Sequence, residues 1–298
     1  MSHYAVGVLV HKIEDLDNAL KPYDENMVVP VYIEETKEEI IKRVRKEIKE
    51  YAESGAYAQW KQNPIKYESE CNNKNHIEYL KNEFPKKLNW TDEECYQDEI
   101  KWHEADQLDE NGSVLSTYNP NSKWDWHVIG GRWKNKILVQ EDCKDYVIGE
   151  SSWFNQDERI EEVPKGYRWC DGAKVSDIQF EKIEELSNQS YEKELRFWEI
   201  VVDGDELKEG EEQPHNLYKV EYYLKRYKDK ETYAKLSSSF KTYALLCDGI
   251  WYEKGEMGWF GCDNATLNSE LAYLDKFNEV ISNPINQDKY FIIVDCHI

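Results

Sequence analysis

The run YFIIVDCHI, residues 290–298, ends this 298-residue chain, and a similar run, YAVGVLV, occupies residues 4–10. Both are dense in the β-branched and aromatic residues that pack well on a pleated sheet. Because their apolar residues are nearly continuous, each run predicts a strand that is covered on both faces in the middle of a sheet. We expect these two strands to lie side by side, although they stand at opposite ends of the sequence.

Two capping boxes predict helix starts, at Thr36-Lys37-Glu38-Glu39 and at Thr91-Asp92-Glu93-Glu94. In such a box, the threonine oxygen and the last glutamate bind backbone N–H groups that a helix start leaves without partners. Apolar residues then recur at helical spacing from residue 40 to residue 48, and Ser54-Gly55 gives the first helix a plausible end.

The last sixty residues predict a hairpin, a helix and a strand, in that order. Residues 242–246 and 249–253 suit two strands joined by a tight turn, and residues 267–281 have the apolar spacing of an amphipathic helix. The predicted fold class is therefore α+β. It has a mixed or antiparallel sheet that includes the N- and C-terminal strands, packed with amphipathic helices, and a less regular middle insertion.

Composition shifts predict three regions along the chain. Residues 1–140 form an N-terminal α+β region, and residues 141–214 form a middle insertion or linker that is helical and acidic. Residues 215–298 form the hairpin–helix–strand region, and its packing with the first region as one domain stays open. The soft boundary near residue 214 rests on the acidic run DGDELKEGEE, residues 203–212.

The chain is strongly acidic, with 60 Asp and Glu against 38 Lys and Arg, a formal net charge of −22. Such a chain repels duplex nucleic acid and anionic lipid unless its bases cluster, so we expect no direct nucleic-acid or membrane partner. The charge either keeps the protein soluble or attracts a basic surface on a partner protein. The acidic residues that we expect to face such a partner are Asp203, Asp205, Glu206, Glu209, Glu211 and Glu212.

The seven cysteines and seven histidines lack the spacings of familiar metal sites. No cysteine pair has CxxC spacing, and no histidines form HxH, HxxxH or HExxH. Scattered thiols suit a reducing compartment, and the N-terminal apolar stretch is too short for a signal peptide. We therefore expect a cytoplasmic protein with no metal and no cofactor.

The segment SKWDWHVIGGRW, residues 122–133, gathers the densest set of functional side chains. As a binding site, its indoles would stack on a ligand, Arg132 would hold an anion, and Gly130-Gly131 would let a ligand approach the backbone. As a core strand, it would bury its tryptophans, and Arg132 would pair with Asp125. Both interpretations stay open. The predicted binding residues are Trp124, Asp125, Trp126, His127, Arg132, Trp133 and Trp259.

The ending Asp295-Cys296-His297 suggests a nucleophilic cysteine, but the strand geometry argues against it. Neighbouring residues of a strand point to opposite faces, so Cys296 and His297 cannot pair with each other. We therefore expect that the protein is not an enzyme. An enzyme with dispersed residues, namely Asp125, His127 and Cys296, stays as an alternative.

Several segments resemble a set of phage- and prophage-borne proteins, and together they cover most of the chain. Within this set, the chain resembles Gabija anti-defense proteins. Gabija is a bacterial defence system built from an ATP-gated DNA nuclease and a helicase-like partner. The resemblance implies a phage-encoded inhibitor that binds this complex in the host cytoplasm and denies it DNA. The segments are MSHYAVGVLV, PYDEN, the helix after Thr36, NHIEYL, FPKKLNWTDEE, YNPNSKWDWHVIGGRW, WYEKGEMGWFG and VDCHI.

Two binding functions therefore compete. A protein–protein inhibitor predicts a large interface with aromatic anchors, and a homo-oligomer, since several linked copies block a large target better than one. A small-molecule binder predicts a nucleotide-like ligand held by the Trp and Arg residues of the 122–133 segment.

Overall fold

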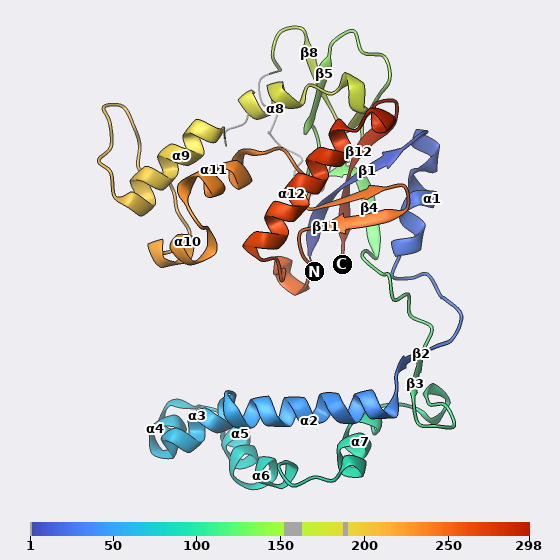
Figure 1. Cartoon of the computed structure of the whole chain (residues 1–298), viewed down its shortest axis with the longest axis vertical. Coiled ribbons are helices and arrows are strands. Elements are labelled where there is room, and N and C mark those ends of the chain that lie inside the picture. The colour runs from blue at the N-terminus through green and yellow to red at the C-terminus, as the bar shows by residue number, and fades with distance from the viewer. Residues whose placement is uncertain (1, 152–162, 187–189) are drawn as a thin grey trace. The chain divides into compact units, whose positions relative to one another are not determined.

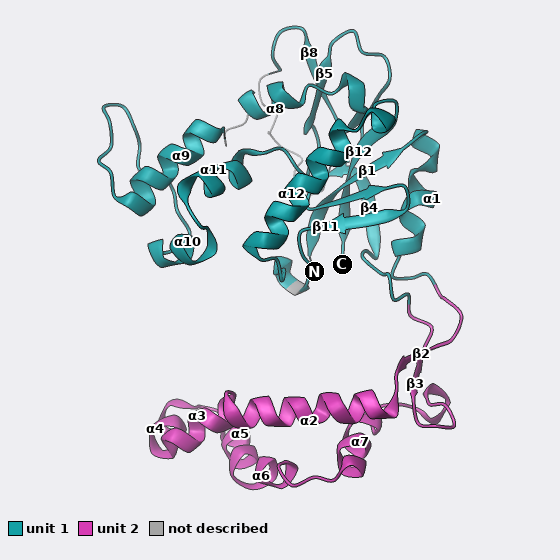
Figure 2. Cartoon of the chain, in the orientation of Figure 1, with its two compact units in different colours: residues 1–27, 119–298 teal, residues 28–118 magenta. Residues whose placement is uncertain are grey.

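The computed structural model describes residues 2–151, 163–186 and 190–298, apart from the side chain of Trp259. The chain forms two compact units (Figure 2). Residues 28–118 make up the helical unit, which is inserted into the sheet unit of residues 1–27 and 119–298. The boundaries predicted at residues 140 and 214 both lie inside the sheet unit, because strands from all parts of it pair in one sheet.

The two terminal strands form the centre of that sheet, and the predicted α+β class is confirmed. β1 (His3–Val10) runs antiparallel to β12 (Tyr290–His297), from the pair His3 and His297 to the pair Val10 and Tyr290. On the other side of β1, β10 (Ala244–Cys247) is parallel to it, and β11 (Ile250–Glu253) completes a hairpin. The two turn residues, Asp248 and Gly249, have φ values of 51° and 75°. Two left-handed residues match the twist of a two-residue hairpin.

The other edge of β12 is shared between two strands. β4 (Trp126–Gly131) pairs with its second half, and β9 (Gly172–Lys174) pairs with its first half. Three further pairings complete the region. They join β7 (Glu150–Ser151) to β4, β6 (Tyr146–Val147) to β9, and β5 (Ile137–Gln140) to β8 (Tyr167–Cys170).

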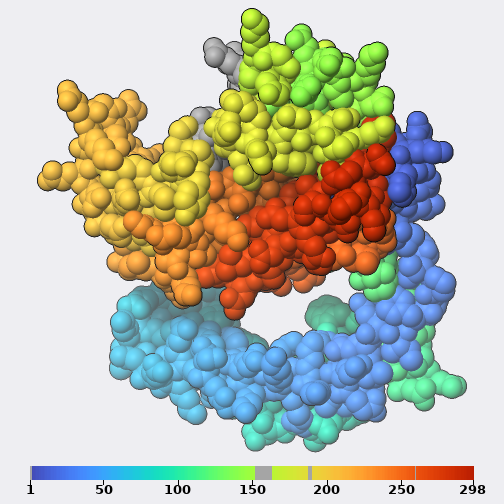
Figure 3. Space-filling model, turned by 45° about the horizontal axis from the view of Figure 1, so that its top comes forward, coloured from blue at the N-terminus to red at the C-terminus, as the bar shows by residue number. Residues whose placement is uncertain are grey.

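Both faces of the central strands are buried, as their continuous apolar sequence predicts. The odd-numbered residues of β1 and β12 share one face of the sheet, here called the odd face. This face carries Ala5, Leu9, Phe291 and Ile293, and it packs against α12 (Leu267–Ser282) and α8 (Phe180–Leu186). Figure 1 shows α12 lying across the sheet, and Figure 3 shows it in red with the segment around α8 in yellow beside it. The even face, which carries Val6, Val8, Ile292 and Val294, packs against α1 (Leu16–Leu20).

The segment of residues 217–241, which suits either a strand or a helix by its sequence, forms two helices. They are α10 (Val220–Arg226) and α11 (Lys230–Ser238), and they pack with α9 (Tyr191–Trp198). Aromatic rings fill the space between the three helices, with Phe197 stacked on Tyr233 at 5.6 Å between ring centroids. This cluster places the end of α11 beside the sheet, where it borders the site described below.

The helical unit begins and ends on a short antiparallel ladder between β2 (Tyr32–Glu35) and β3 (Val114–Ser116). Both predicted capping boxes are present, at the starts of α2 (Lys37–Glu53) and α7 (Asp92–Ile100). The other helices are α3 (Ala56–Gln62), α4 (Pro64–Glu70), α5 (Lys74–Glu78), the π-helical turn Tyr79–Glu83 and α6 (Phe84–Lys87). Within the described ranges, no helix of either unit is long and apolar enough to cross a membrane.

Candidate functional site

Three rings cluster at the end of the sheet on its odd face. The antiparallel register places His3 of β1 opposite His297 of β12, and His297 opposite Trp126 of β4. The ring centroids of the two histidines lie 4.8 Å apart, and Trp126 lies 5.7 Å from His3 and 6.2 Å from His297. Strand pairing thus joins residues that are almost 300 positions apart in the sequence.

Each of these histidines is bound to its own carboxylate through Nδ1. The Nδ1 of His3 lies 2.9 Å from Oδ1 of Asp295, and the Nδ1 of His297 lies 2.6 Å from Oδ1 of Asp125. An ionised carboxylate only accepts hydrogen bonds, so each Nδ1 carries the hydrogen and each Nε2 is left available as a base or, when protonated, as an acid. Each histidine side chain is 16% exposed, so a ligand can reach the pair.

Gly130 and Gly131 lie against two buried carboxylates. Their φ values are 77° and 54°, a region that side chains disfavour. A Cβ atom on Gly131 would stand 2.4 Å from Oδ2 of Asp295, and one on Gly130 would stand 3.1 Å from Cγ of Asp171. The sequence interpretation, that this pair allows close approach of a ligand, is corrected here: the glycines leave room for the protein's own aspartates.

The same two aspartates hold the loop that follows β4. Asp171 accepts hydrogen bonds from the backbone N–H groups of Asn135 at 2.6 Å and Gly149 at 2.7 Å, and Asp295 accepts one from Arg132 at 2.9 Å. Both aspartates are fully buried. Burial raises the pKa of Asp171, while the two N–H donors oppose that rise. The loop is therefore tied to the core on both sides, which fixes the position of Trp133.

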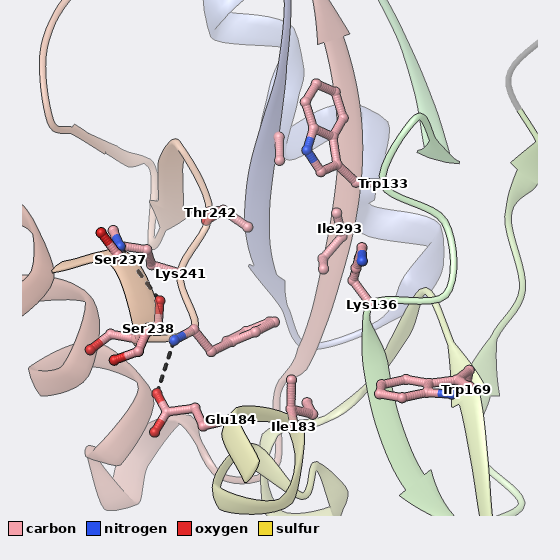
Figure 4. Close-up of a pocket in the computed structure, with 13 residues that line it drawn as sticks. Trp133, Lys136, Trp169, Ile183, Glu184, Ser237, Ser238, Lys241, Thr242 and Ile293 are labelled. Atoms are coloured by element: carbon pink, nitrogen blue, oxygen red, sulfur yellow. Dashed lines mark hydrogen bonds between the residues drawn. The ribbon is translucent and has the colours of Figure 1, made fainter. Parts of the chain in front are cut away.

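Trp133 lines a cleft between the odd face of the sheet and the end of α11. The cleft consists of two adjoining hollows of about 260 and 450 Å³. Figure 4 shows Ser238 and Lys241 on one side of the smaller hollow, Trp133 and Trp169 on the other, and Ile293 of β12 between them. His3 lines the larger hollow, so one of the two paired histidines borders the cleft. The hollows share Ala5, Trp133, Ser237, Ser239, Lys241 and Thr242.

Lys241 brings a positive charge into this cleft. Its Nζ donates to the carbonyl oxygens of Leu236 and Ser239, at the end of α11 where backbone carbonyls lack helical partners. Burial removes water from the ammonium group and lowers its pKa to about 8. An anion bound in the cleft would therefore stabilise the protonated form of this lysine.

Trp169 lines the smaller hollow and has a buried, unsatisfied donor. It is 9% exposed, and its indole N–H has no hydrogen-bond acceptor among the residues that the structure describes. A buried donor without an acceptor is costly, so this N–H destabilises the wall of the hollow.

The structure separates the residues predicted from the 122–133 segment. Trp124 is buried on the even face, where its indole N–H donates to the carbonyl of Leu20 at 3.2 Å. His127 packs against Trp124 on that face and lies 3.3 Å from Asp17. Trp126 and Asp125 join the histidine pair, and Trp133 lines the cleft. The core interpretation therefore describes Trp124, and the binding interpretation of Trp126 and Trp133 stays a prediction.

The alternative set of Asp125, His127 and Cys296 does not come together. His127 and Cys296 are partners across β4 and β12, but Asp125 binds His297 on the odd face. Cys296 is fully buried, and burial raises the pKa of its thiol well above the ordinary value. A thiol that resists ionisation is a poor nucleophile.

Ion pairs with Arg196 neutralise part of the predicted acidic surface. Arg196 binds Asp205 at 3.5 Å and Glu211 at 2.7 Å, and also Glu199. This guanidinium lowers the pKa of Glu211 to about 2, with help from the backbone N–H of Lys208. Asp203, Glu206, Glu209 and Glu212 are exposed. The side chain of Trp259, also predicted to bind, lies outside the described structure.

Sequence reasoning missed His3, Asp171 and Lys241. A signal for His3 was present, because pairing the terminal strands antiparallel brings the start of one to the end of the other. Asp171 and Lys241 gave no local signal, since their roles depend on burial.

Among the described residues, no group of three or more His, Cys, Asp or Glu side chains is arranged to hold a metal ion. Comparisons with protein families, with curated proteins and with solved structures found no match to this chain.

Proposed function

We propose that the sheet unit binds a small anionic ligand with a flat ring, of the nucleotide class, in the cleft beside Trp133. The observation that carries this proposal is the partly buried ammonium group of Lys241 in the same cleft as the Trp133 indole. A ring and a negative charge on one molecule would satisfy both groups.

The chemistry of the cleft supports a ligand of this kind. Trp133 offers a flat surface for stacking, and the side chains of Ser237 and Ser239 supply hydroxyl groups. The two hollows, of about 260 and 450 Å³, together suit a nucleotide-sized molecule. The loop of Trp133 is tied to Asp171 and Asp295, so the site is largely formed before the ligand arrives.

Calorimetric titration of the full chain with AMP, GMP, CMP and UMP tests the proposal. We expect at least one nucleotide to bind, and adenosine and inorganic phosphate to bind more weakly because each satisfies only half of the site. Trp133→Leu and Lys241→Met should each weaken binding about tenfold or more, the effect of losing about 1.4 kcal/mol. Trp102→Leu and Lys235→Met remove a tryptophan and a lysine elsewhere, and should leave the affinity unchanged. Absence of binding by all four nucleotides at millimolar concentration refutes the proposal.

We propose protein–protein inhibition as a second candidate function, carried by the exposed apolar side chains of the helical unit. Trp102 is 80% exposed and Ile65 is 85% exposed. Exposed tryptophan is a common anchor of protein interfaces. The net charge of −22 would favour a basic partner, and the resemblance to anti-defense proteins points to a DNA nuclease complex of the host cytoplasm.

A pull-down with a purified Gabija-type nuclease complex, followed by a DNA-cleavage assay, tests this second candidate. We expect capture and inhibition, and a homo-oligomer by light scattering. Trp102→Ser should lose capture, whereas Trp133→Leu should retain it. A purified complex that is neither captured nor inhibited at micromolar concentration rules the candidate out.

A further inference from the structure

The two carboxylate–histidine pairs at the end of the sheet have the geometry of acid–base groups. In each pair the carboxylate holds Nδ1 and so fixes both the tautomer and the orientation of the ring. Neither Nε2 has a hydrogen-bond partner within the described ranges. The rings are 4.8 Å apart, so both can approach the same reacting group.

We infer that His3 and His297 catalyse the cleavage of a short ribonucleotide bound in the cleft, by attack of its own 2′-hydroxyl on the adjacent phosphodiester. This inference rests on the proposed function, since the cleft must bind a nucleotide for the histidines to act. His3 lines the larger hollow together with Trp133 and Lys241, and the ring of His297 lies directly behind it, with its centroid 4.8 Å from that of His3.

The reaction needs only groups that the cleft and the substrate supply. The neutral imidazole of one histidine takes the proton of the 2′-hydroxyl, and the bond between O2′ and phosphorus forms. The bond between phosphorus and O5′ breaks, and the protonated second imidazole gives its proton to O5′. The products are a 2′,3′-cyclic phosphate and a free 5′-hydroxyl, and the histidines return to their starting states by exchanging protons with water.

Three features of the chain favour this substrate class. The attacking hydroxyl is part of the substrate, so it is already held near the phosphorus and no nucleophilic side chain is required. Lys241 in the cleft can stabilise the negative charge of the phosphate. The net charge of −22 disfavours a long nucleic-acid strand, and so favours a substrate of two or a few nucleotides.

Other titratable groups also surround the pair. Asp295 and Asp125 hold the two imidazoles and serve as positioning residues. The larger hollow, which His3 lines, is also lined by other titratable residues: Tyr4, Tyr227, Lys241, Tyr243, Lys254 and Glu270.

Incubation of the full chain with the dinucleotides ApA, CpA, GpA and UpA, followed by chromatography, tests the inference. We expect release of adenosine and of a 2′,3′-cyclic phosphate, with a bell-shaped dependence of kcat on pH because one imidazole must be neutral and the other protonated. The 2′-deoxy analogues should not react. His3→Gln and His297→Gln should each lower kcat at least ~100-fold, the usual contribution of a general acid or base.

The matched control is His127→Gln, on the same strand as Trp126 but on the even face, and it should retain full activity. Asp125→Asn provides a second variant should either glutamine variant fail to fold; it should lower kcat with little change in KM. Cleavage that persists in the double variant of His3 and His297 overturns the inference, as does cleavage of the deoxy analogues.

Binding of AMP separates this inference from the proposed function. A protein that binds AMP but cleaves none of the four dinucleotides refutes the catalytic inference and leaves the binding function standing. A protein that neither binds AMP nor cleaves the dinucleotides refutes both.

Discussion

The backbone N–H of Arg132 donates to Oδ2 of Asp295 at 2.9 Å, so a fully buried carboxylate of β12 anchors the loop that follows β4. The other oxygen of the same carboxylate holds the imidazole of His3. One side chain therefore couples the position of the cleft loop to the orientation of a candidate acid–base group.

This coupling predicts a large effect of Gly131→Ala. The new Cβ would stand 2.4 Å from Asp295, and the φ of 54° would disfavour any side chain. We expect a loss of about 2–5 kcal/mol of unfolding free energy, from left-handed strain and overpacking together. Gly166→Ala is the control, because Gly166 also has a positive φ, of 87°, but has open space around it. It should lose only about 1 kcal/mol. Equal losses in urea denaturation would contradict the role of Asp295.

The tryptophans of the 122–133 segment should differ in their effect on stability. Trp124 is buried and its N–H is bound to Leu20, so Trp124→Ala should lower the unfolding free energy by about 3–5 kcal/mol. Trp133→Ala should cost less stability, because Trp133 is only partly buried, but it should weaken nucleotide binding. Chemical denaturation and titration with AMP, performed on both variants, measure the two effects separately.

Nucleotide binding should weaken in alkaline solution because of Lys241. The pKa of this lysine is about 8 in the protein without ligand, and a bound phosphate favours its protonated form. Below pH 8 the amine is already protonated, so this group adds no pH dependence. Above pH 8 binding must add a proton to it, and the Kd should rise about tenfold for each pH unit. The phosphate of AMP is fully ionised above pH 7 and does not contribute.

Calorimetry with AMP between pH 7 and 9.5 provides the measurement. Lys241→Met should bind weakly at every pH and show no such slope. A slope that persists in that variant would show that another group takes up the proton.

The Arg196 cluster predicts a shifted titration of Glu211. In the intact protein the pKa of Glu211 is about 2, so its contribution to stability is full above its ordinary pKa and is lost as the pH falls toward 2. Arg196→Gln removes the main cause of this shift, and the pKa should rise toward the ordinary value of about 4.3. A carboxyl-detected NMR titration measures the change. Lys182→Gln, which removes the partner of Glu185, should leave Glu211 unaffected.

Much of the fold was predictable because its signals are local. The central strands are continuously apolar, and the two capping boxes consist of residues three positions apart. The strands between residues 146 and 174 were not predicted, because each is only two to four residues long and no periodicity develops over that length.

The site was predictable only in part, because its geometry depends on strand register. The 122–133 segment predicted Trp126 and Trp133, which lie beside the histidines and at the cleft, but the sequence does not show that Trp124 points to the opposite face. The pairing of His3 with His297 follows from the antiparallel alignment of β1 and β12. The role of Lys241 depends on how deeply α11 and the sheet bury it, and no local pattern encodes that burial.

The central position of β12 also has a consequence for biosynthesis. During synthesis β1 leaves the ribosome long before β12, and it gains this antiparallel neighbour only after Tyr290–His297 has been translated. Contacts of such long sequence separation form slowly, because a large loop must close before they stabilise the chain. The hydrophobic residues of β1 therefore lack this partner strand during most of translation, when chaperones have the greatest opportunity to bind them.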